Sequence, residues 1–264
     1  MPEGIEVEYY RRGAEASLSR SISSLVAEDL YYLKGQTSPH LLQEALVGRE
    51  LLQANRIGKL LYIEVDTGDI LGFRFGMTGR IIVDGSAPID YLEYSSARDE
   101  PSWDRFVMNF ADGGSMRIRD PRRLGGVELN PDLNLLGYDL YAVEVHELSQ
   151  VLSGSSRPVK ARLMDQSEIA GLGNLLTDEI LWRASIDPRR PSNSLGSREI
   201  QTLFKHFSKT ISELTSLGGS HMGTLQDHRI RGGLCPKDGI PLERYKIGGR
   251  TTYSCPEHQK GNEG

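Results

Sequence analysis

The segment EIAGLGNLLTDEILW (residues 168–182) says most about how this chain folds. Its glycines permit a tight turn in which the backbone approaches other groups closely, and a helix is expected to follow from Asn174. Backbone N–H groups at the start of such a helix can hold an anion such as a phosphate. The segment also fits an ordinary linker between two helices, and taken alone it leaves both interpretations open.

A strong helical pattern lies downstream, over residues 197–217. Its apolar residues recur at spacings of three and four, as one buried face of a helix requires. These residues are Ile200, Leu203, Phe204, Phe207, Ile211, Leu214 and Leu217. Ser197 is a suitable N-cap and Gly218 a suitable stop, so the sequence predicts one long helix within a region that is helical from about residue 140.

The segment CPKDGIPLERYKIGGRTTYSCPEH (residues 235–258) carries both cysteines of the chain. Cys235 and Asp238 are three residues apart, and Cys255 and His258 repeat that spacing after sixteen intervening residues. This spacing is typical of a zinc site built from two knuckles on a β-hairpin. A small hairpin buries little apolar area, so a metal cross-link has a physical purpose there. We therefore expect one structural zinc ion; a hairpin that has lost its metal and is held by packing is the alternative.

The region before residue 130 has the composition of β-structure. Five short runs are rich in β-branched or aromatic residues: LLYIEV (60–65), ILGFRF (70–75), GRIIV (79–83), DRFVMNF (104–110) and SMRIR (115–119). Turn formers separate these runs, so residues 20–130 are predicted to form a β-sandwich or barrel. Residues 3–18 and 39–47 have helical patterns, and PDLNLLGYDL (131–140) suits a connection between two domains.

Composition places the chain among globular proteins. It has 264 residues, of which 38% are hydrophobic and 25% charged, and it lacks an apolar run of about 18 residues. Its start has no basic region followed by an apolar stretch, so we expect a cytoplasmic, nucleoid-associated protein. A net charge of −5 argues mildly against nucleic-acid binding. However, RIRDPRR (117–123) contains four arginines and one aspartate, which allows a local basic face.

The chain begins MPEGIEVEYYRR, and Pro2 has two interpretations. Proline suits the first turn of a helix because its missing N–H would be unpaired there, and acidic residues suit the positive end of the helix dipole. Alternatively, removal of Met1 would make Pro2 a free secondary amine. An α-amine has a pKa of about 8, so part of it is unprotonated at neutral pH and can attack an aldehyde-like carbon.

The ordered set of motifs resembles the formamidopyrimidine-DNA glycosylase and endonuclease VIII (Fpg/Nei) family. The matching motifs are MPEGIEVE, RIGKLLYIEV, FGMTGR, RDPRRLG, VKARLMDQSEIAGLGNLLTDEILWRASIDP and the terminal hairpin. The resemblance implies an α+β fold with an N-terminal β-sandwich that carries the N-terminal helix. A helix–two-turn–helix (H2TH) domain and a zinc-finger β-hairpin would follow, with a DNA cleft flanked by the sandwich and the H2TH domain. The implied divisions are 1–130, 131–228 and 229–264.

The resemblance also implies a bifunctional DNA glycosylase and abasic-site (AP) lyase of base excision repair. A damaged base would be flipped out of the duplex, and Pro2 would attack C1′ of its sugar. The resulting iminium ion would then drive loss of the 3′ phosphate and afterwards of the 5′ phosphate. The implied partner is damaged double-stranded DNA, with no membrane association and a monomeric state.

Site residues follow from the same resemblance. The catalytic residues implied are Pro2, Glu3, Lys59 and Arg250. The DNA-binding residues implied are Glu6, Arg74, Met77, Arg122, Leu124, Lys160 and Asn174. Glu3 would transfer protons, and Lys59, Asn174 and Arg250 would hold phosphates beside the lesion. Met77, Arg122 and Leu124 would fill the space that the extruded nucleotide leaves. The metal ligands expected are Cys235, Asp238, Cys255 and His258.

Several departures from the family pattern leave alternatives open. Asp238 and His258 replace two cysteines, Leu124 replaces a phenylalanine of the Fpg branch, and Arg74 replaces a histidine. Residues 218–233 are too short for the long loop that covers oxidised guanine in Fpg enzymes, so the preferred lesion stays open between oxidised purines, oxidised pyrimidines and others. Two other function classes also remain: a catalytically reduced abasic-site binding protein, and a protein that binds structured RNA.

Overall fold

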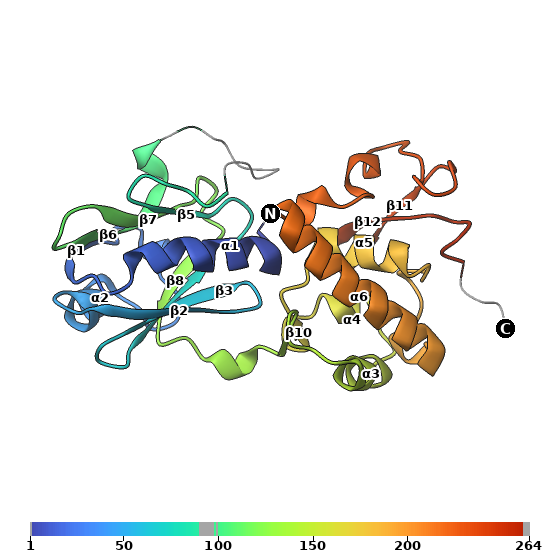
Figure 1. Ribbon diagram of the computed structural model, residues 1–264, viewed down its shortest axis with the longest axis horizontal. Coiled ribbons are helices and arrows are strands. Elements are labelled where there is room, and N and C mark those ends of the chain that lie inside the picture. Colours follow the sequence, from blue (N-terminus) through green and yellow to red (C-terminus); the bar gives the residue numbers. More distant parts are fainter. Residues whose placement is uncertain (1, 90–97, 99, 261–264) are drawn as a thin grey trace. The chain divides into compact units, whose positions relative to one another are not determined.

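The computed structural model describes residues 2–89, 98 and 100–260 (Figure 1). The chain forms two compact units. The first comprises Met1–Pro2 and Glu6–Asn134, and the second comprises Glu3–Ile5 and Leu135–Gly264. Three residues next to the N-terminus therefore belong to the second unit. Met1, on whose removal the expected amine depends, lies outside the described residues.

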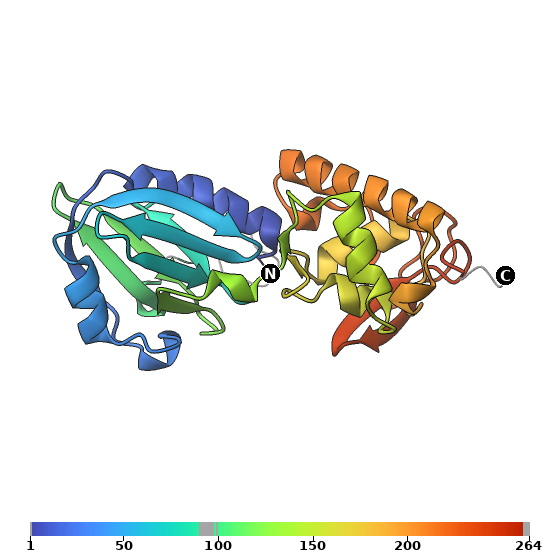
Figure 2. The ribbon, with the colours of Figure 1, turned by 90° about the horizontal axis from the view of Figure 1, so that it is seen from below.

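The first unit is built on two antiparallel sheets of four strands each, with strand orders β1-β6-β7-β5 and β2-β3-β4-β8 (Figure 2). The strands are β1 (Ile22–Val26), β2 (Leu51–Ile57), β3 (Leu60–Val65), β4 (Ile70–Arg74), β5 (Arg80–Val83), β6 (Asp104–Phe110), β7 (Ser115–Arg119) and β8 (Gly126–Leu129). All five runs predicted as strands are strands here. The two sheets enclose one hydrophobic core, which confirms the sandwich.

Alternation along the strands explains that core. In β3, for example, Leu61, Ile63 and Val65 are buried and point inward, whereas Tyr62 and Glu64 are only half-buried. Helix α1 (Gly4–Ala14) lies along the sandwich, and its Tyr10 ring packs 4.5 Å from that of Phe75. The helix predicted over residues 3–18 is therefore shorter, and a 3₁₀ turn follows it.

The second predicted helix is α2 (Pro39–Leu46), which the Ser38 hydroxyl caps by accepting a hydrogen bond from the Leu41 N–H at 3.2 Å. Short 3₁₀ helices are η1 (Glu15–Ser17), η2 (Leu30–Tyr32), η3 (Pro101–Trp103), η4 (Leu133–Leu135), η5 (Ser192–Ser194), η6 (Ser220–Met222) and η7 (Gln226–His228).

The second unit is mainly helical, as predicted. Its helices are α3 (Val145–Ser153), α4 (Val159–Leu163), α5 (Asn174–Arg183) and α6 (Ser197–Leu217). Its strands are β9 (Tyr138–Asp139), β10 (Ile169–Ala170), β11 (Glu243–Ile247) and β12 (Arg250–Ser254). Helix α6 has the predicted bounds, and Gly218 ends it with a φ of 107°. Its N-cap is Gly196 rather than Ser197, because the Glu199 carboxylate accepts the Gly196 N–H at 2.9 Å.

A hairpin closes the second unit. Strands β11 and β12 pair antiparallel, and Gly248 and Gly249 form the two-residue turn with φ angles of 55° and 75°. Two positive φ angles are what a type I′ turn requires. A small apolar cluster supports the hairpin; it contains Trp182, Leu225, Cys235, Leu242, Tyr253 and Cys255. Among the described residues, no helix combines the length and the apolar character needed to cross a bilayer.

Candidate functional site and metal centre

The carboxylate of Glu3 is fully buried at the N-terminus of α5. It accepts hydrogen bonds from the backbone N–H groups of Gly173 at 3.0 Å, Leu175 at 2.9 Å and Leu176 at 3.1 Å. These are donors that a helix leaves unpaired in its first turn, and the positive end of the helix dipole favours the negative charge. The second residue of the expected catalytic pair is therefore held rigidly by three backbone donors.

This arrangement changes the interpretation of the glycine-rich turn. The sequence allows an anion such as a phosphate at the start of α5 as one of two interpretations, and the anion found there is the protein's own carboxylate, 170 residues away in sequence from Gly173. A Cβ atom on Gly173 would lie 2.3 Å from the Glu3 carboxyl carbon, so a side chain at this position would displace the carboxylate. The glycine is required for the close approach of Glu3.

Lys160 forms a buried ion pair in the same unit. Its ammonium lies 2.7 Å from the Asp178 carboxylate, and both side chains are completely buried. Arg229 contacts the other oxygen of Asp178 at 3.0 Å. Burial lowers the pKa of Lys160 and raises that of Asp178, and the charge of each partner opposes the shift of the other. The pair connects α4, which carries Lys160, with α5, which carries Asp178.

The hairpin is attached to this pair through its second strand. The Lys160 ammonium donates to the Thr252 hydroxyl at 2.8 Å and to the Thr251 carbonyl at 3.3 Å. The Asn174 amide donates to the same Thr251 carbonyl at 3.0 Å. Two of the predicted DNA-binding residues thus converge on one carbonyl, next to the exposed Arg250 that begins β12. The Lys160 ammonium is directed at the hairpin and away from solvent.

Lys59 and Arg74 are neighbours in the sheet of the first unit. Lys59 lies in the two-residue turn between β2 and β3, where Gly58 has a φ of 57°. Leu60, the next residue, pairs with Arg74 of β4. The Arg74 guanidinium also lies 2.7 Å from the Glu128 carboxylate of β8, and 41% of the Arg74 side chain is exposed. Glu128 therefore neutralises part of the charge of Arg74.

Two loops bring Met77, Arg122 and Leu124 into one region of the sandwich. Gly76, beside Met77, approaches the Leu124 backbone so closely that a Cβ atom on it would lie 2.5 Å from the Leu124 carbonyl carbon. Leu124 is exposed by 49%. Residues expected to fill the space of an extruded nucleotide are therefore adjacent in this unit.

Asp120 fixes both loops from inside the sandwich. Its buried carboxylate accepts hydrogen bonds from the Thr78 hydroxyl at 2.5 Å and from the Gly125 N–H at 2.8 Å. A single carboxylate therefore sets the position of the loop that contains Met77 and of the loop that contains Leu124.

The two consecutive arginines of the second loop have different surroundings. The Arg123 guanidinium donates to both Asp29 oxygens, at 2.7 and 2.6 Å, and this hydrogen bonding lowers the pKa of Asp29. The Arg122 side chain is exposed, and its guanidinium has no partner within the part of the chain that the structure describes. Glu6, the remaining candidate, is buried on α1 beside Tyr10.

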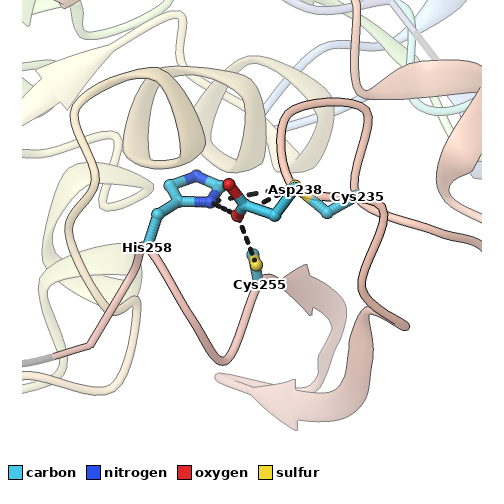
Figure 3. A group of neighbouring side chains, drawn as sticks. All are labelled: Cys235, Asp238, Cys255 and His258. Atoms are coloured by element: carbon cyan, nitrogen blue, oxygen red, sulfur yellow. Dashed lines mark hydrogen bonds and ion pairs between the residues drawn. The ribbon is translucent and has the colours of Figure 1, made fainter.

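The four predicted metal ligands form one cluster beside the hairpin (Figure 3). The donor atoms of Cys235, Asp238, Cys255 and His258 all lie within 4.8 Å of one another. The Cys235 sulfur is 3.6 Å from Asp238 Oδ2 and 3.8 Å from His258 Nδ1. Asp238 also contacts Cys255 Sγ at 3.0 Å and His258 Nδ1.

The two separations measured from Cys235, 3.6 and 3.8 Å, match the ligands of a tetrahedral ion, whereas the contacts of Asp238 with Cys255 and His258 are shorter. Zinc bonds of about 2.0–2.3 Å place neighbouring ligand atoms roughly 3.3–3.8 Å apart. Burial raises the pKa of the Cys255 thiol to about 11, so a cation is needed to hold it as a thiolate at neutral pH. The donor set of two sulfurs, one imidazole nitrogen and one carboxylate oxygen is one that zinc accepts. The cluster can therefore hold a metal ion.

Several residues of these sites carry no sequence signal that distinguishes them. Asp120 is one acid within an arginine-rich run, and Asp178 and Trp182 are interior residues of a helix. Their partners are far away in sequence, so no local pattern identifies the contacts. The one available hint that the Asp178 side chain is buried is the apolar residues one helical turn away, Leu175, Leu181 and Trp182.

Comparison with known proteins agrees with this architecture. The pattern of the formamidopyrimidine-DNA glycosylase N-terminal domain matches residues 1–127, and that of the formamidopyrimidine-DNA glycosylase H2TH domain matches residues 138–226. The formamidopyrimidine-DNA glycosylase of Herpetosiphon aurantiacus is 32% identical, over 97% of this chain and 98% of that protein. The enzyme of the same name from Arabidopsis thaliana is 30% identical, over 98% of this chain and 71% of that protein.

Solved structures give the same result. Lactococcus lactis Fpg in complex with DNA containing an abasic site superposes with a TM-score of 0.81 and 25% identity, covering 98% of this chain and 100% of that one. The same enzyme with DNA containing an N7-benzyl-Fapy-dG lesion gives 0.81 and 26%, with equal coverage. The match extends over both units and over the order of their elements, and on this basis the chain belongs to the formamidopyrimidine-DNA glycosylase family.

Proposed function

We propose that this chain, a DNA glycosylase of base excision repair by its family, also cleaves DNA at abasic sites through the nitrogen of Pro2. One observation carries the proposal: the residue after Pro2 is a carboxylate held by three backbone N–H groups of α5. Because Glu3 is fixed, a Pro2 amine freed by removal of Met1 could move only by rotation about the backbone bonds that join Pro2 to Glu3. Such fixed placement is how an enzyme makes a weak nucleophile effective.

The proposed reaction begins with attack of the Pro2 nitrogen on C1′ of the damaged nucleotide. The base leaves with a proton, and Glu3 assists ring opening by transferring a proton at the sugar. The resulting iminium ion withdraws electrons from C2′, whose proton is lost as the 3′ phosphate leaves. A second elimination releases the 5′ phosphate. Covalent catalysis thus divides one difficult displacement into several easier steps.

In this proposal Lys59, Asn174 and Arg250 contact phosphates beside the lesion. Lys59 and Arg250 supply positive charge from hairpin turns, and Asn174 supplies an amide donor. One hydrogen of the Asn174 Nδ2 group is used by the Thr251 carbonyl, so the second remains for a phosphate oxygen. Lys160 acts in our proposal by supporting the hairpin that carries Arg250. We further propose that residues 1–130, 131–228 and 229–264 act as the catalytic, H2TH and finger domains of a monomer.

Met77, Arg122 and Leu124 would occupy the space vacated by the flipped nucleotide, which offsets part of the lost stacking. Arg122 and Arg123 allow a matched test, because only Arg123 is already paired with an acid. Arg122→Ala is expected to reduce cleavage of a lesion-bearing duplex at least tenfold, and Arg123→Ala less than threefold. Equal losses would argue against a role of Arg122 in the vacated space.

Borohydride trapping tests the central proposal. Wild-type protein whose intact mass shows that Met1 has been removed is mixed with borohydride and duplex DNA that contains an abasic site. A covalent protein–DNA adduct is expected. Pro2→Gly and a permanent N-terminal extension should abolish or strongly reduce both the adduct and strand cleavage. Full cleavage by either variant would refute Pro2 as the nucleophile. Tight abasic-site binding without an adduct would instead indicate a damage-binding protein, and preference for structured RNA would indicate the third function class.

Substrate preference needs a separate measurement. A panel of duplexes with oxidised purines, oxidised pyrimidines and abasic sites, with base release and nicking measured separately, would identify the lesion. Release of a base in at least one duplex supports the glycosylase function. Nicking restricted to abasic sites would leave only the lyase.

A further inference from the structure

Trp182 contacts two of the four ligands in the metal cluster. It lies near the end of α5, outside the segment that supplies the ligands, and only 9% of it is exposed. Its indole N–H donates to the Cys235 sulfur at 3.3 Å. Its backbone carbonyl is 3.2 Å from His258 Nε2. One residue of the helical part therefore binds both a sulfur ligand and an imidazole ligand.

The contact with Cys235 restricts the position of the sulfur. An indole N–H can only donate, and at 3.3 Å the Cys235 sulfur is its acceptor. The donor therefore limits the rotation of the sulfur within the cluster. The surrounding apolar side chains of Leu225, Leu242 and Tyr253 strengthen this effect, since they keep competing water away.

The contact with His258 selects its ligating nitrogen. The Trp182 carbonyl belongs to the last turn of α5, where the dipole is negative; it accepts the Ser185 N–H at 3.2 Å, and its second lone pair can serve His258. It accepts a hydrogen bond from Nε2 only when Nε2 carries the proton. The lone pair of the imidazole is then on Nδ1, the nitrogen that faces Cys235 and Asp238. The Trp182 and His258 rings also meet edge-on, with centroids 5.9 Å apart.

We infer that Trp182 is a positioning residue for the metal: from α5 it holds Cys235 in the position and His258 in the tautomer that bind a divalent, zinc-like ion. This inference rests on the proposed metal site and adds to it a dependence on α5. The hydrogen-bonding partners of ligands commonly change metal affinity ten- to a hundredfold when removed. Metal binding beside the β11–β12 hairpin (the finger) thus depends on a residue of α5, the helix whose N-terminus also holds Glu3.

Trp182→Phe tests the inference because it removes the N–H and keeps most of the ring and the backbone carbonyl. Zinc affinity is measured on the full chain by competition with a chromophoric chelator, and we expect it to fall roughly tenfold. Cobalt substitution gives a second readout, since loss of the donor should shift the sulfur-to-cobalt charge-transfer band. The matched control is Trp103→Phe, the same change at the other tryptophan, which lies in the first unit. It should leave both readouts unchanged.

The outcomes separate the inference from the proposal beneath it. If wild-type protein binds no zinc or cobalt, the metal site itself is refuted. If wild type binds and Trp182→Phe binds with equal affinity and an unchanged cobalt spectrum, only the role of Trp182 is refuted. Thermal unfolding with and without zinc distinguishes ligand positioning from packing. A smaller zinc-dependent rise in melting temperature supports positioning, whereas an equal rise from a lower metal-free value would attribute the defect to packing and overturn the inference.

Discussion

The hairpins β2–β3 and β11–β12 have similar turns, but different parts of the protein pack against them. Each has a two-residue turn with glycine at positive φ, and each places a cation, Lys59 or Arg250, at that turn. The β2–β3 hairpin is joined to β4 and contributes inward side chains to the large core of the sandwich. The β11–β12 hairpin is a separate two-stranded sheet, and its Tyr253 packs in a small cluster of buried residues. A two-stranded ribbon of this kind is marginally stable by itself.

The difference shows two ways to hold a charged hairpin tip. In the sandwich, the β2–β3 hairpin is held by many apolar contacts of the large core. In the finger, a few strong polar links replace the missing core: the metal cluster at its base and the Lys160–Asp178 pair at its second strand. We therefore expect the finger to respond sharply to single changes of charge or ligand, and the sandwich to respond in proportion to the apolar area lost.

Metal removal should produce the largest difference between the hairpins. Chelation, or Cys255→Ser, is expected to remove hydrogen-exchange protection from the backbone amides of β11–β12, because a small hairpin lacks other means of closing its base. Amides of β2–β3 should keep their protection. Hydrogen exchange followed by mass spectrometry compares both hairpins in one sample.

The control for that experiment is addition of chelator to Cys255→Ser, which should have no further effect. Full protection of β11–β12 in the metal-free wild type would contradict the comparison. It would favour the alternative of a finger held by packing alone.

The next largest effect is expected from Lys160→Met, which leaves the Asp178 carboxylate buried beside Arg229 alone. Breaking a buried ion pair on one side costs about 3–5 kcal/mol, because one charge loses its compensation. The double variant Lys160→Met with Asp178→Asn should recover part of this loss. Denaturant unfolding of single and double variants measures the coupling.

Lys209→Met is the matched control, since Lys209 is an exposed lysine on α6. It should change the free energy of unfolding by no more than about 0.5 kcal/mol. Equal effects at Lys160 and Lys209 would mean that the buried pair does not support the finger.

The sequence predicts those parts of the molecule that depend on local spacing. Apolar spacing gives the bounds of α6, alternation and turn residues give the strands of the sandwich, and ligand spacing gives the metal cluster. Cys235 and Asp238 are close because they are three positions apart in the sequence, and the hairpin between the knuckles brings Cys255 and His258 to the same place. Local rules suffice wherever the chain between partners is short or regular.

Contacts between residues far apart in the sequence can be identified only from the structure. The sequence leaves the helix N-terminus at Asn174 open between an anion site and an ordinary linker, and the anion that occupies it is Glu3, which no spacing rule connects with it. The Lys160–Asp178 pair was not predictable for the same reason. Each residue looks like an ordinary polar residue of a helix in the sequence, and only tertiary packing makes them a buried ion pair. Buried polar contacts depend on the fold as a whole, which is why their positions were not predictable from local patterns.

Ile63→Ala tests the sandwich side of the comparison. Ile63 is completely buried in β3, and removal of a buried isoleucine side chain leaves a cavity that costs about 3 kcal/mol. The loss should appear in the slowest-exchanging amides of β2–β3 and leave the zinc-dependent protection of β11–β12 unchanged. Gln53→Ala, at an exposed position of β2, is the control and should be neutral within about 0.5 kcal/mol. Loss of exchange protection only in the β2–β3 turn would contradict the view that the sandwich core unfolds as one unit.

The smallest expected effect concerns the turns. Gly249 has a φ of 75° and no atom within 4 Å of an added Cβ, so Gly249→Ala introduces backbone strain alone, about 1–2 kcal/mol. Gly249→Asn should cost less, because asparagine tolerates this conformation. The strain in the β11–β12 hairpin should stay within the amides near the turn, since the expected metal ion would hold the opposite end of the hairpin. Gly58→Ala introduces backbone strain, from a φ of 57°, at a turn whose strand β3 is hydrogen-bonded to β4, so its effect should spread into the sheet. Residue-resolved exchange in the two variants measures this difference, and an equally wide spread in both would mean that the two hairpins are supported alike.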